Sequence, residues 1–295
     1  MRRTGRALAV AAIMLGVLAG CGDDEPSASA PEESSTSLTT DPQAKTVAIT
    51  AMDYAFEAPD SIEGGLIEIS FTNGGKEPHF AGLAKVAEGK TFDDAKAVLT
   101  AAPSDTPPSG PPPFEEYAGA ATMDPGAKGS ATFNLPAGSY ALFCTLPAPD
   151  GVPHAAKGMI KPLTVTEGIA AGVPDAVATM SATDFALAGS PPTGSGAAVV
   201  AIRNQGKQLH EVNLVELMAD KTMEDVVAWF RAPAGPPPMG FLSGVAVKPG
   251  EEGTALFDLK AGSNYAFICA IPDSLSGDFV VHIVKGMYTA AFTVS

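Results

Sequence analysis

Residues 140–144 read YALFC and residues 154–159 read HAAKGM, and the pattern returns as YAFIC at 265–269 and HIVKGM at 282–287. In an extended strand alternate side chains share one face, so each cysteine ends a row of large apolar side chains. The loop after each cysteine supplies a histidine and then a methionine before the next strand is expected to begin. We therefore expect a thiol, an imidazole and a thioether to meet around one point in each half of the chain.

A second histidine completes each set, because an Asn-x-Gly turn precedes a histidine in both halves. The two sets are His79, Cys144, His154 and Met159, and His210, Cys269, His282 and Met287. They use all four histidines of the chain and every cysteine except Cys21. Two imidazoles, a thiolate and a weak axial thioether are the ligands of a blue copper electron-transfer site. The sequence thus predicts one copper ion in each half.

The two sets belong to an internal repeat of about 128 residues. Other landmarks recur in the same order: KTFDD at 90–94 and KTMED at 221–225, GPPP at 110–113 and 235–238, LPAGSY at 135–140 and LKAGSNY at 259–265. The offsets drift between 124 and 131 residues, so loops have changed length while the landmarks kept their order. We expect two domains, at 45–167 and 174–295, joined by residues 168–173.

Each repeat reads as a series of short strands with one short helical insertion. Abundant Gly and Pro and few runs of helix-forming residues favour an all-β fold. Strands are expected in the first repeat at 46–51, 66–72, 131–135, 140–144 and 160–165. A helix is expected after each capping threonine, Thr91 and Thr222. We interpret the apolar stripes of these helices as packing surfaces. They consist of Phe92, Ala95, Val98 and Leu99 in the first repeat, and Met223, Val226, Val227 and Phe230, with Trp229 beside them, in the second.

The string Tyr-x-x-x-Cys followed by Pro-His-x-x-x-Gly-Met resembles the copper loop of plastocyanin and related cupredoxins. The first repeat carries the whole string, with Tyr140, Pro153 and Gly158, and the second has Val281 in place of the proline. The resemblance implies two tandem Greek-key cupredoxin-like β-sandwich domains, one type 1 copper per domain and one-electron transfer. It also implies that the second histidine of each set presents an edge to solvent, where a redox partner protein docks.

The loops between the cysteine and the second histidine depart from the small cupredoxins. Nine residues separate Cys144 from His154 and twelve separate Cys269 from His282, whereas small cupredoxins have shorter loops. A longer loop resembles that of the two-domain nitrite reductases. The longer loop and the missing proline put the second site in more question than the first.

Residues 1–20 read as a secretory leader, with a positive start and an apolar run at 7–18 that is too short to span a bilayer. The run ends in LAGC at 18–21, which resembles the bacterial lipoprotein processing site and implies that Cys21 is lipidated. The alternative is an ordinary cleaved signal. The Ser, Thr, Pro and acidic content of residues 21–44 predicts a disordered tether. We expect an extracytoplasmic lipoprotein on the cell membrane of a bacterium.

The chain is acidic, with a net charge of −15, or −18 without the three leader arginines. Nucleic acid binding needs Lys and Arg, so no nucleic-acid partner is expected. A structural zinc site is disfavoured because the chain has neither Cys-x-x-Cys nor closely paired histidines. A disulfide between Cys144 and Cys269 is disfavoured because it would have to cross the domain boundary.

Electron transfer is the function we expect, and an enzyme is not expected. Multicopper enzymes need further copper centres built mostly from extra histidines, and all four histidines already belong to the two sets. Copper storage or delivery and a metal-free cupredoxin-like interaction scaffold are the alternatives. Delivery proteins often use exposed tracts rich in Met and His, and the sequence has no such tract.

Overall fold

Strands that alternate between buried and partly exposed side chains make up most of the fold. In β4 (Gly65–Asn73), for example, Ile67, Ile69 and Phe71 are buried while the residues between them are half-buried. This two-residue period places one face of each strand against the core. The computed structural model describes residues 43–101, 110–276 and 280–295, so the expected leader, Cys21 and nearly all of the tether lie outside the described residues.

The secondary-structure elements recur in the same order in the two halves. The first half contains β1 (Lys45–Met52), β2 (Ala55–Glu57), β3 (Ser61–Glu63), β4, β5 (His79–Val86), α1 (Phe92–Leu99), β6 (Phe114–Met123), β7 (Lys128–Leu135), β8 (Gly138–Phe143), the 3-10 turn η1 (His154–Lys157) and β9 (Ile160–Thr166). The second half contains β10 (Ala178–Thr183), β11 (Ala186–Ala188), β12 (Gly196–Asn204), β13 (His210–Leu217), α2 (Met223–Arg231), β14 (Met239–Val247), β15 (Glu252–Leu259), β16 (Asn264–Ile268), the 3-10 turn η2 (His282–Lys285) and β17 (Phe292–Thr293).

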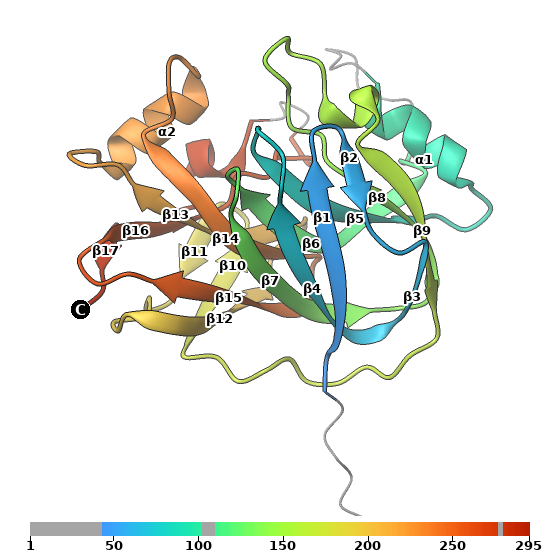
Figure 1. Ribbon diagram of the computed structural model, residues 1–295, viewed down its shortest axis with the longest axis horizontal. Coiled ribbons are helices and arrows are strands. Elements are labelled where there is room, and N and C mark those ends of the chain that lie inside the picture. The colour runs from blue at the N-terminus through green and yellow to red at the C-terminus, as the bar shows by residue number, and fades with distance from the viewer. Residues whose placement is uncertain (1–42, 102–109, 277–279) are drawn as a thin grey trace, which may run out of the picture. The chain divides into compact units, whose positions relative to one another are not determined.

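The described strands form two sheets, and both sheets run through both halves (Figure 1). One sheet has the order β11-β10-β12-β15-β7-β4-β1-β2, and the other has the order β17-β16-β13-β14-β6-β5-β8-β9-β3. The halves join where β7 pairs with β15 and where β6 pairs with β14, both antiparallel. A single cluster of buried side chains contains residues of both sheets, including Phe133 of β7 and Leu142 of β8. The protein is therefore all-β, as expected.

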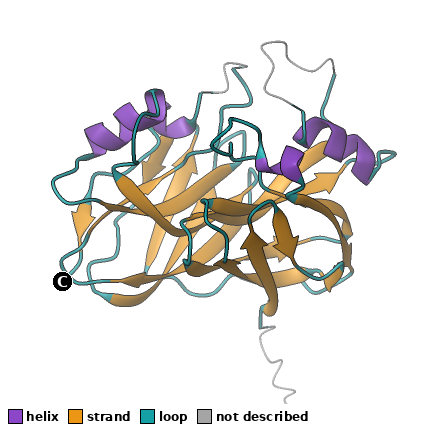
Figure 2. Cartoon of the chain, turned by 45° about the horizontal axis from the view of Figure 1, so that its top comes forward, coloured by secondary structure: helices purple, strands orange, loops and turns teal. Residues whose placement is uncertain are grey.

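The two helices form where the threonine caps predict them. The Thr91 hydroxyl accepts a hydrogen bond from the Asp94 N–H, and the Thr91 N–H donates to the Asp94 carboxylate; Thr222 and Asp225 do the same. In α1 the side chains of Ala95 and Leu99 are buried, but Val98, which was expected on the same stripe, is exposed. Figure 2 shows both helices on the same side of the sheets. Among the described residues, no helix has the length and apolar character needed to cross a bilayer.

The expected strands of the first half correspond to β1, β4, β7, β8 and β9, with one informative difference at the end of β8. The strand ends at Phe143, and Cys144 lies just beyond it. The Cys144 N–H donates to the Met159 carbonyl, in register with the antiparallel pairing of β8 and β9. The two described cysteines are free and buried, so they form no disulfide.

Candidate metal centres

The first group brings together three donors from distant parts of the chain. His79 is the first residue of β5, Cys144 follows β8, and His154 is the first residue of η1. The Nδ1 atoms of His79 and His154 lie 3.1 Å apart, and the Cys144 Sγ lies 3.6 Å from His154 Nδ1. All three side chains are buried, and their ligand atoms lie within 4.8 Å of one another. The fold thus brings two imidazole nitrogens and a sulfur close to one point.

Backbone hydrogen bonds close the loop that carries these donors. Cys144 N–H donates to the Met159 carbonyl at 3.1 Å, and Met159 N–H donates to the His154 carbonyl at 2.9 Å. Between them Gly158 has φ 117°, a left-handed conformation that favours glycine. The closed loop buries Met159 completely, in the same cluster as Cys144. This explains why Gly and Met follow the histidine at a fixed spacing.

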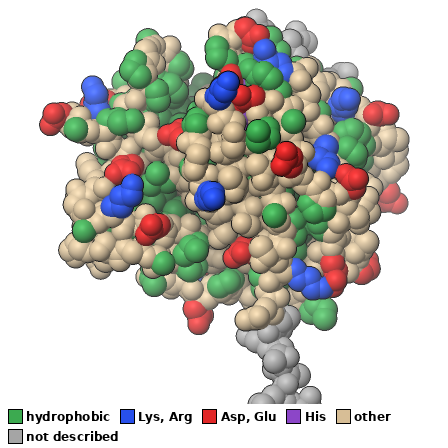
Figure 3. Space-filling view, in the orientation of Figure 1, with side chains coloured by type: hydrophobic (Ala, Val, Ile, Leu, Met, Phe, Trp, Pro, Cys, Tyr) green, Lys and Arg blue, Asp and Glu red, His purple; other side chains and the backbone are tan. Residues whose placement is uncertain are grey.

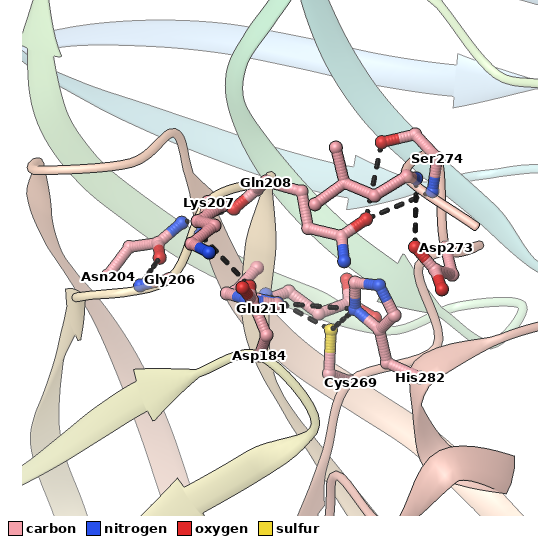
Figure 4. A network of polar contacts seen from close by, with 12 residues as sticks. Asp184, Asn204, Gly206, Lys207, Gln208, Glu211, Cys269, Asp273, Ser274 and His282 are labelled. Carbon is pink, nitrogen blue, oxygen red and sulfur yellow. Dashed lines mark hydrogen bonds and ion pairs between the residues drawn. The ribbon is translucent and has the colours of Figure 1, made fainter.

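The second group repeats this geometry. His210 Nδ1 lies 3.2 Å from His282 Nδ1, and the Cys269 Sγ lies 3.3 Å from His282 Nδ1. Figure 4 shows Cys269 and His282 pointing toward one another. Cys269 N–H donates to the Met287 carbonyl at 3.1 Å, and Met287 N–H donates to the His282 carbonyl at 3.0 Å. The longer loop and the missing proline therefore leave the arrangement of these donors unchanged.

Carboxylates form hydrogen bonds with the outer nitrogens of two histidines, His154 and His210, and a third carboxylate lies near that of His79. Asp53 Oδ1 lies 3.5 Å from His79 Nε2, and Asp184 Oδ1 lies 3.0 Å from His210 Nε2. Glu77 Oε2 lies 2.8 Å from His154 Nε2. A partner on the outer nitrogen fixes the ring orientation and directs the lone pair of the other nitrogen inward.

Sequence reasoning missed the two aspartates and gave Glu77 no selected role. The repeat did carry a signal for the aspartates, because MDYAFE at 52–57 and TDFALA at 183–188 match at the offset that relates the two first histidines. Figure 4 shows how Asp184 is fixed, since its carboxylate also accepts the Lys207 N–H at 2.9 Å.

The second histidines do not present an edge to solvent, which corrects the expectation from the resemblance. His154 is 1% exposed and His282 is fully buried. The ring of Tyr54 lies edge-on to His154, with ring centroids 5.3 Å apart, and Lys157 Nζ lies over the Tyr54 ring. Phe185, which follows Asp184, occupies the equivalent place beside His282. The face drawn in Figure 3 accordingly shows charged and apolar side chains but no histidine.

Burial controls the protonation of these donors. It lowers the pKa of His79 and of His210, and it lowers the pKa of His282 to about 4. These imidazoles are therefore neutral near pH 7 and keep a free lone pair. Burial also raises the pKa of the Cys144 thiol to about 12 and the pKa of the Cys269 thiol in the same direction. A metal that took the thiolate form would have to displace a proton from each thiol.

The donor sets fit copper. Neutral imidazoles and a thiolate, with a buried thioether nearby, match the preference of copper for nitrogen and soft sulfur ligands. The donors are buried, which keeps solvent away from the centre. The carboxylates beside the outer nitrogens supply the supporting contacts that such centres use. Both buried His-Cys-His groups satisfy these conditions, so two sites fit copper in one chain.

No protein-family model matches the chain, and no curated protein matches it. Among solved structures it is similar to a dithionite-reduced auracyanin from Roseiflexus castenholzii, at 25% identity over 42% of this chain and 98% of that one, with a TM-score of 0.29. It is also similar to auracyanin A, a blue copper protein from Chloroflexus aurantiacus, at 23% identity over 42% and 100% of the two chains, with a TM-score of 0.29. A multicopper oxidase matches at 15% identity over 86% and 89%, with a TM-score of 0.24.

Proposed function

We propose that this chain is an extracytoplasmic electron-transfer protein with one type 1 copper site in each half. The proposed ligands are His79, Cys144, His154 and Met159 in the first half, and His210, Cys269, His282 and Met287 in the second. The halves 45–167 and 174–295 would be tandem Greek-key cupredoxin-like domains whose sheets join edge to edge. The proposal assigns no enzymatic activity to the chain.

One observation carries the proposal: each half buries two imidazoles and a thiol whose ligand atoms lie within 4.8 Å of one another. Leaving such polar groups together in an apolar interior costs free energy unless they bind something. A bound cation would repay that cost by satisfying the inward nitrogen and sulfur lone pairs at once. Rigid, water-free ligands also suit a centre that changes charge without rearranging.

The same burial favours electron transfer over copper delivery. A delivery protein has to release its metal to an acceptor, and neither group has a ligand at the surface. A metal-free interaction scaffold would need no buried thiol with two inward imidazoles in each half. All four histidines of the chain lie in the two groups, so no histidine remains to build a further copper centre for catalysis.

The leader and Cys21 support a lipid anchor at the outer face of a bacterial cell membrane. The tether would then keep the folded part close to that surface. A redox partner protein, still to be identified, would exchange electrons there, and the acidic charge makes nucleic acid a poor partner.

Addition of Cu(II) to the purified protein, followed by visible spectroscopy, tests the proposal. We expect an intense thiolate-to-copper absorption band at two copper ions per chain. Cys144→Ser and Cys269→Ser should each remove one copper and about half of the band, and the double variant should remove all of it. If the double variant binds as much copper as the parent and shows the same visible absorption band, the ligand assignment is wrong.

A further inference from the structure

A cavity of about 490 Å³ lies where the two halves meet. Its lining comes from β5, β6 and the loop after β8 in the first half, and from β13, α2 and the loop after β16 in the second. Ala118, Gly119 and Ala120 of β6 line it beside the pairing of β6 with β14, and their small side chains leave the space open. The volume falls in the range of small-molecule sites, roughly 300–1,000 Å³.

The cavity adjoins both candidate metal centres along the chain. Eight of its lining residues are direct sequence neighbours of proposed ligands: Pro78 and Phe80 of His79, Phe143 and Thr145 of Cys144, Leu209 and Glu211 of His210, Ala270 of Cys269, and Val281 of His282. Successive side chains of a strand point to opposite faces. A ligand side chain that points into the core therefore has neighbours that point toward the cavity. A molecule bound there would contact the residues that flank the proposed ligands of each centre in the sequence.

Five aromatic side chains contribute to the lining, among aliphatic residues. Phe80 and Phe143 meet edge to face at 5.6 Å between ring centroids. Trp229 and Phe230 of α2 do the same at 5.3 Å, and Phe230 also meets Phe241. Such edges and faces favour another flat ring over an irregular aliphatic molecule. The half-buried Trp229, which sequence analysis assigned to packing, forms part of this wall.

The polar groups of the lining restrict the charge of the ligand. Glu116 and Glu211 line the cavity, and no Lys, Arg or His does so among the described residues. The Glu211 carboxylate is nearly buried and accepts the Ala270 N–H at 2.8 Å. Both carboxyl groups can accept hydrogen bonds from hydroxyl groups, and the described lining offers no cationic side chain to hold an anionic ligand. A neutral ring with hydroxyl groups therefore fits better than an acid or a phosphate ester.

We propose that this cavity binds a neutral aromatic diol of the hydroquinone class, which acts as an electron donor. The electron-transfer part of this inference rests on the function proposed above, whereas the binding part does not need a metal. A hydroquinone that becomes a quinone loses two electrons and two protons. Two type 1 Cu(II) centres beside one cavity would accept one electron each, becoming Cu(I), and the two protons would pass to water. One donor molecule would thus reduce both halves of the chain.

The binding part is tested on the full chain without metal, under anaerobic conditions, by calorimetric titration with 1,4-naphthohydroquinone. We expect one saturable site per chain. Trp229→Ala and Glu116→Gln should each weaken binding, Trp229→Ala by about tenfold or more because it removes a ring from the wall. Glu115→Gln is the matched control, since Glu115 pairs with Lys248 and does not line the cavity. It should bind like the parent.

The electron-transfer part is tested on the copper-loaded chain by following the bleaching of the visible band. Trp229→Ala should slow bleaching by naphthohydroquinone about tenfold. It should leave bleaching by ascorbate unchanged, because ascorbate is an anion and the described lining offers it no cationic side chain. No saturable binding, equal binding by parent and both cavity variants, or tighter binding of a cationic benzylamine would overturn the proposal. A chain that binds the diol without ever forming a visible copper band would instead overturn the proposed function and leave the binding site standing.

Discussion

Glu77 Oε2 lies 2.8 Å from the outer nitrogen of His154, and no carboxylate occupies the matching place in the second half. The repeat has Gln208 where the first half has Glu77, and the Gln208 amide oxygen accepts from Ser274 instead (Figure 4). His282 Nε2 has no hydrogen-bond partner among the described residues. The two centres therefore share their inner donors, but only the first has a carboxylate in contact with the outer nitrogen of its second histidine.

This difference predicts unequal reduction potentials. A carboxylate on the outer side of a ligand stabilises the more positive oxidised metal, so Glu77 should lower the potential of the first centre. Glu77→Gln should raise it, by roughly 59 mV for each tenfold change in the relative affinity of the two oxidation states. Redox titration of the visible band in a Cys269→Ser background, which leaves only the first centre, measures this shift.

The matched control is Gln208→Glu in a Cys144→Ser background. If the carboxylate turns toward His282, the potential of the second centre should fall. Equal potentials in the two parent centres, together with no shift in either variant, would contradict a role for Glu77 in tuning.

A second prediction concerns the Asn-x-Gly turn before each first histidine. A Cβ atom on Gly75 would lie 2.7 Å from His79 Nε2 and 2.6 Å from Asp53 Oδ1. Gly75→Ala should therefore push the imidazole and its carboxylate apart and weaken copper binding at the first centre about tenfold or more. Equilibrium titration with a copper chelator in a Cys269→Ser background measures the affinity.

Gly74→Ala is the control for this turn. A Cβ atom there would meet only the flexible end of Met52 closely, at 3.0 Å, so copper affinity should stay near that of the parent. A Gly75→Ala protein with unchanged affinity would show that the turn glycine is not needed to seat the histidine.

The meeting of cysteine, histidine and methionine was predictable because each cysteine ends a strand and the histidine and methionine share one spacing in both halves. Tyr140, Leu142 and Cys144 share a face in any extended strand, and the Gly158 turn brings the following methionine back to the cysteine. These relationships involve residues close together in the sequence, and each of them occurs in both halves of the repeat. The helix caps at Thr91 and Thr222 were predictable for the same reason.

The contacts between distant segments were not predictable. Glu77 lies two residues before His79, yet its carboxylate contacts His154 in another loop, which only the folded arrangement brings near. The pairing of β6 with β14 could not be predicted from the sequence either. The unpaired backbone groups at the edge of a strand can bond to any other strand, so they do not specify a partner. The expectation of a solvent-exposed His154 failed for a related reason, since the ring of Tyr54, from a distant part of the chain, lies against it.

A third prediction concerns the pH dependence of stability. Burial opposes ionisation of Asp273, but the Lys285 ammonium and other hydrogen-bond donors hold its pKa well below the usual 3.8. The unfolded chain therefore binds this proton more readily, so the contribution is present above about pH 3.8 and disappears as pH falls through the folded-state pKa. Asp273→Asn should cost about 3–5 kcal/mol at pH 7, because it breaks a buried pair, and less near pH 3. Urea unfolding of the metal-free protein at both pH values measures the difference.

Asp150→Asn provides the comparison in the first half. Asp150 forms an ion pair with Lys157 at 2.6 Å, but its side chain is 56% exposed. Exposed pairs contribute about 0–1 kcal/mol, so this variant should lose little stability at either pH. A loss for Asp273→Asn that is the same at pH 7 and pH 3 would exclude the ionised pair as its cause.

A fourth prediction tests how the halves hold together. The Asp124 N–H donates to the Phe241 carbonyl, and the Asp124 carboxylate accepts the Phe241 N–H, both at 2.9 Å across the junction of β6 and β14. Asp124→Ala would leave the Phe241 N–H without its acceptor, at a cost of about 1–3 kcal/mol. Because this side-chain bond joins the halves, its loss should separate the unfolding of the two centres. We expect calorimetry to show one transition for the parent and a broadened or double transition for Asp124→Ala.

The control is Asp93→Ala, an exposed change on α1 away from the junction, which should keep a single transition. A lower but still single transition for Asp124→Ala would mean that the other pairs of β6 with β14 and β7 with β15 are enough to couple the halves.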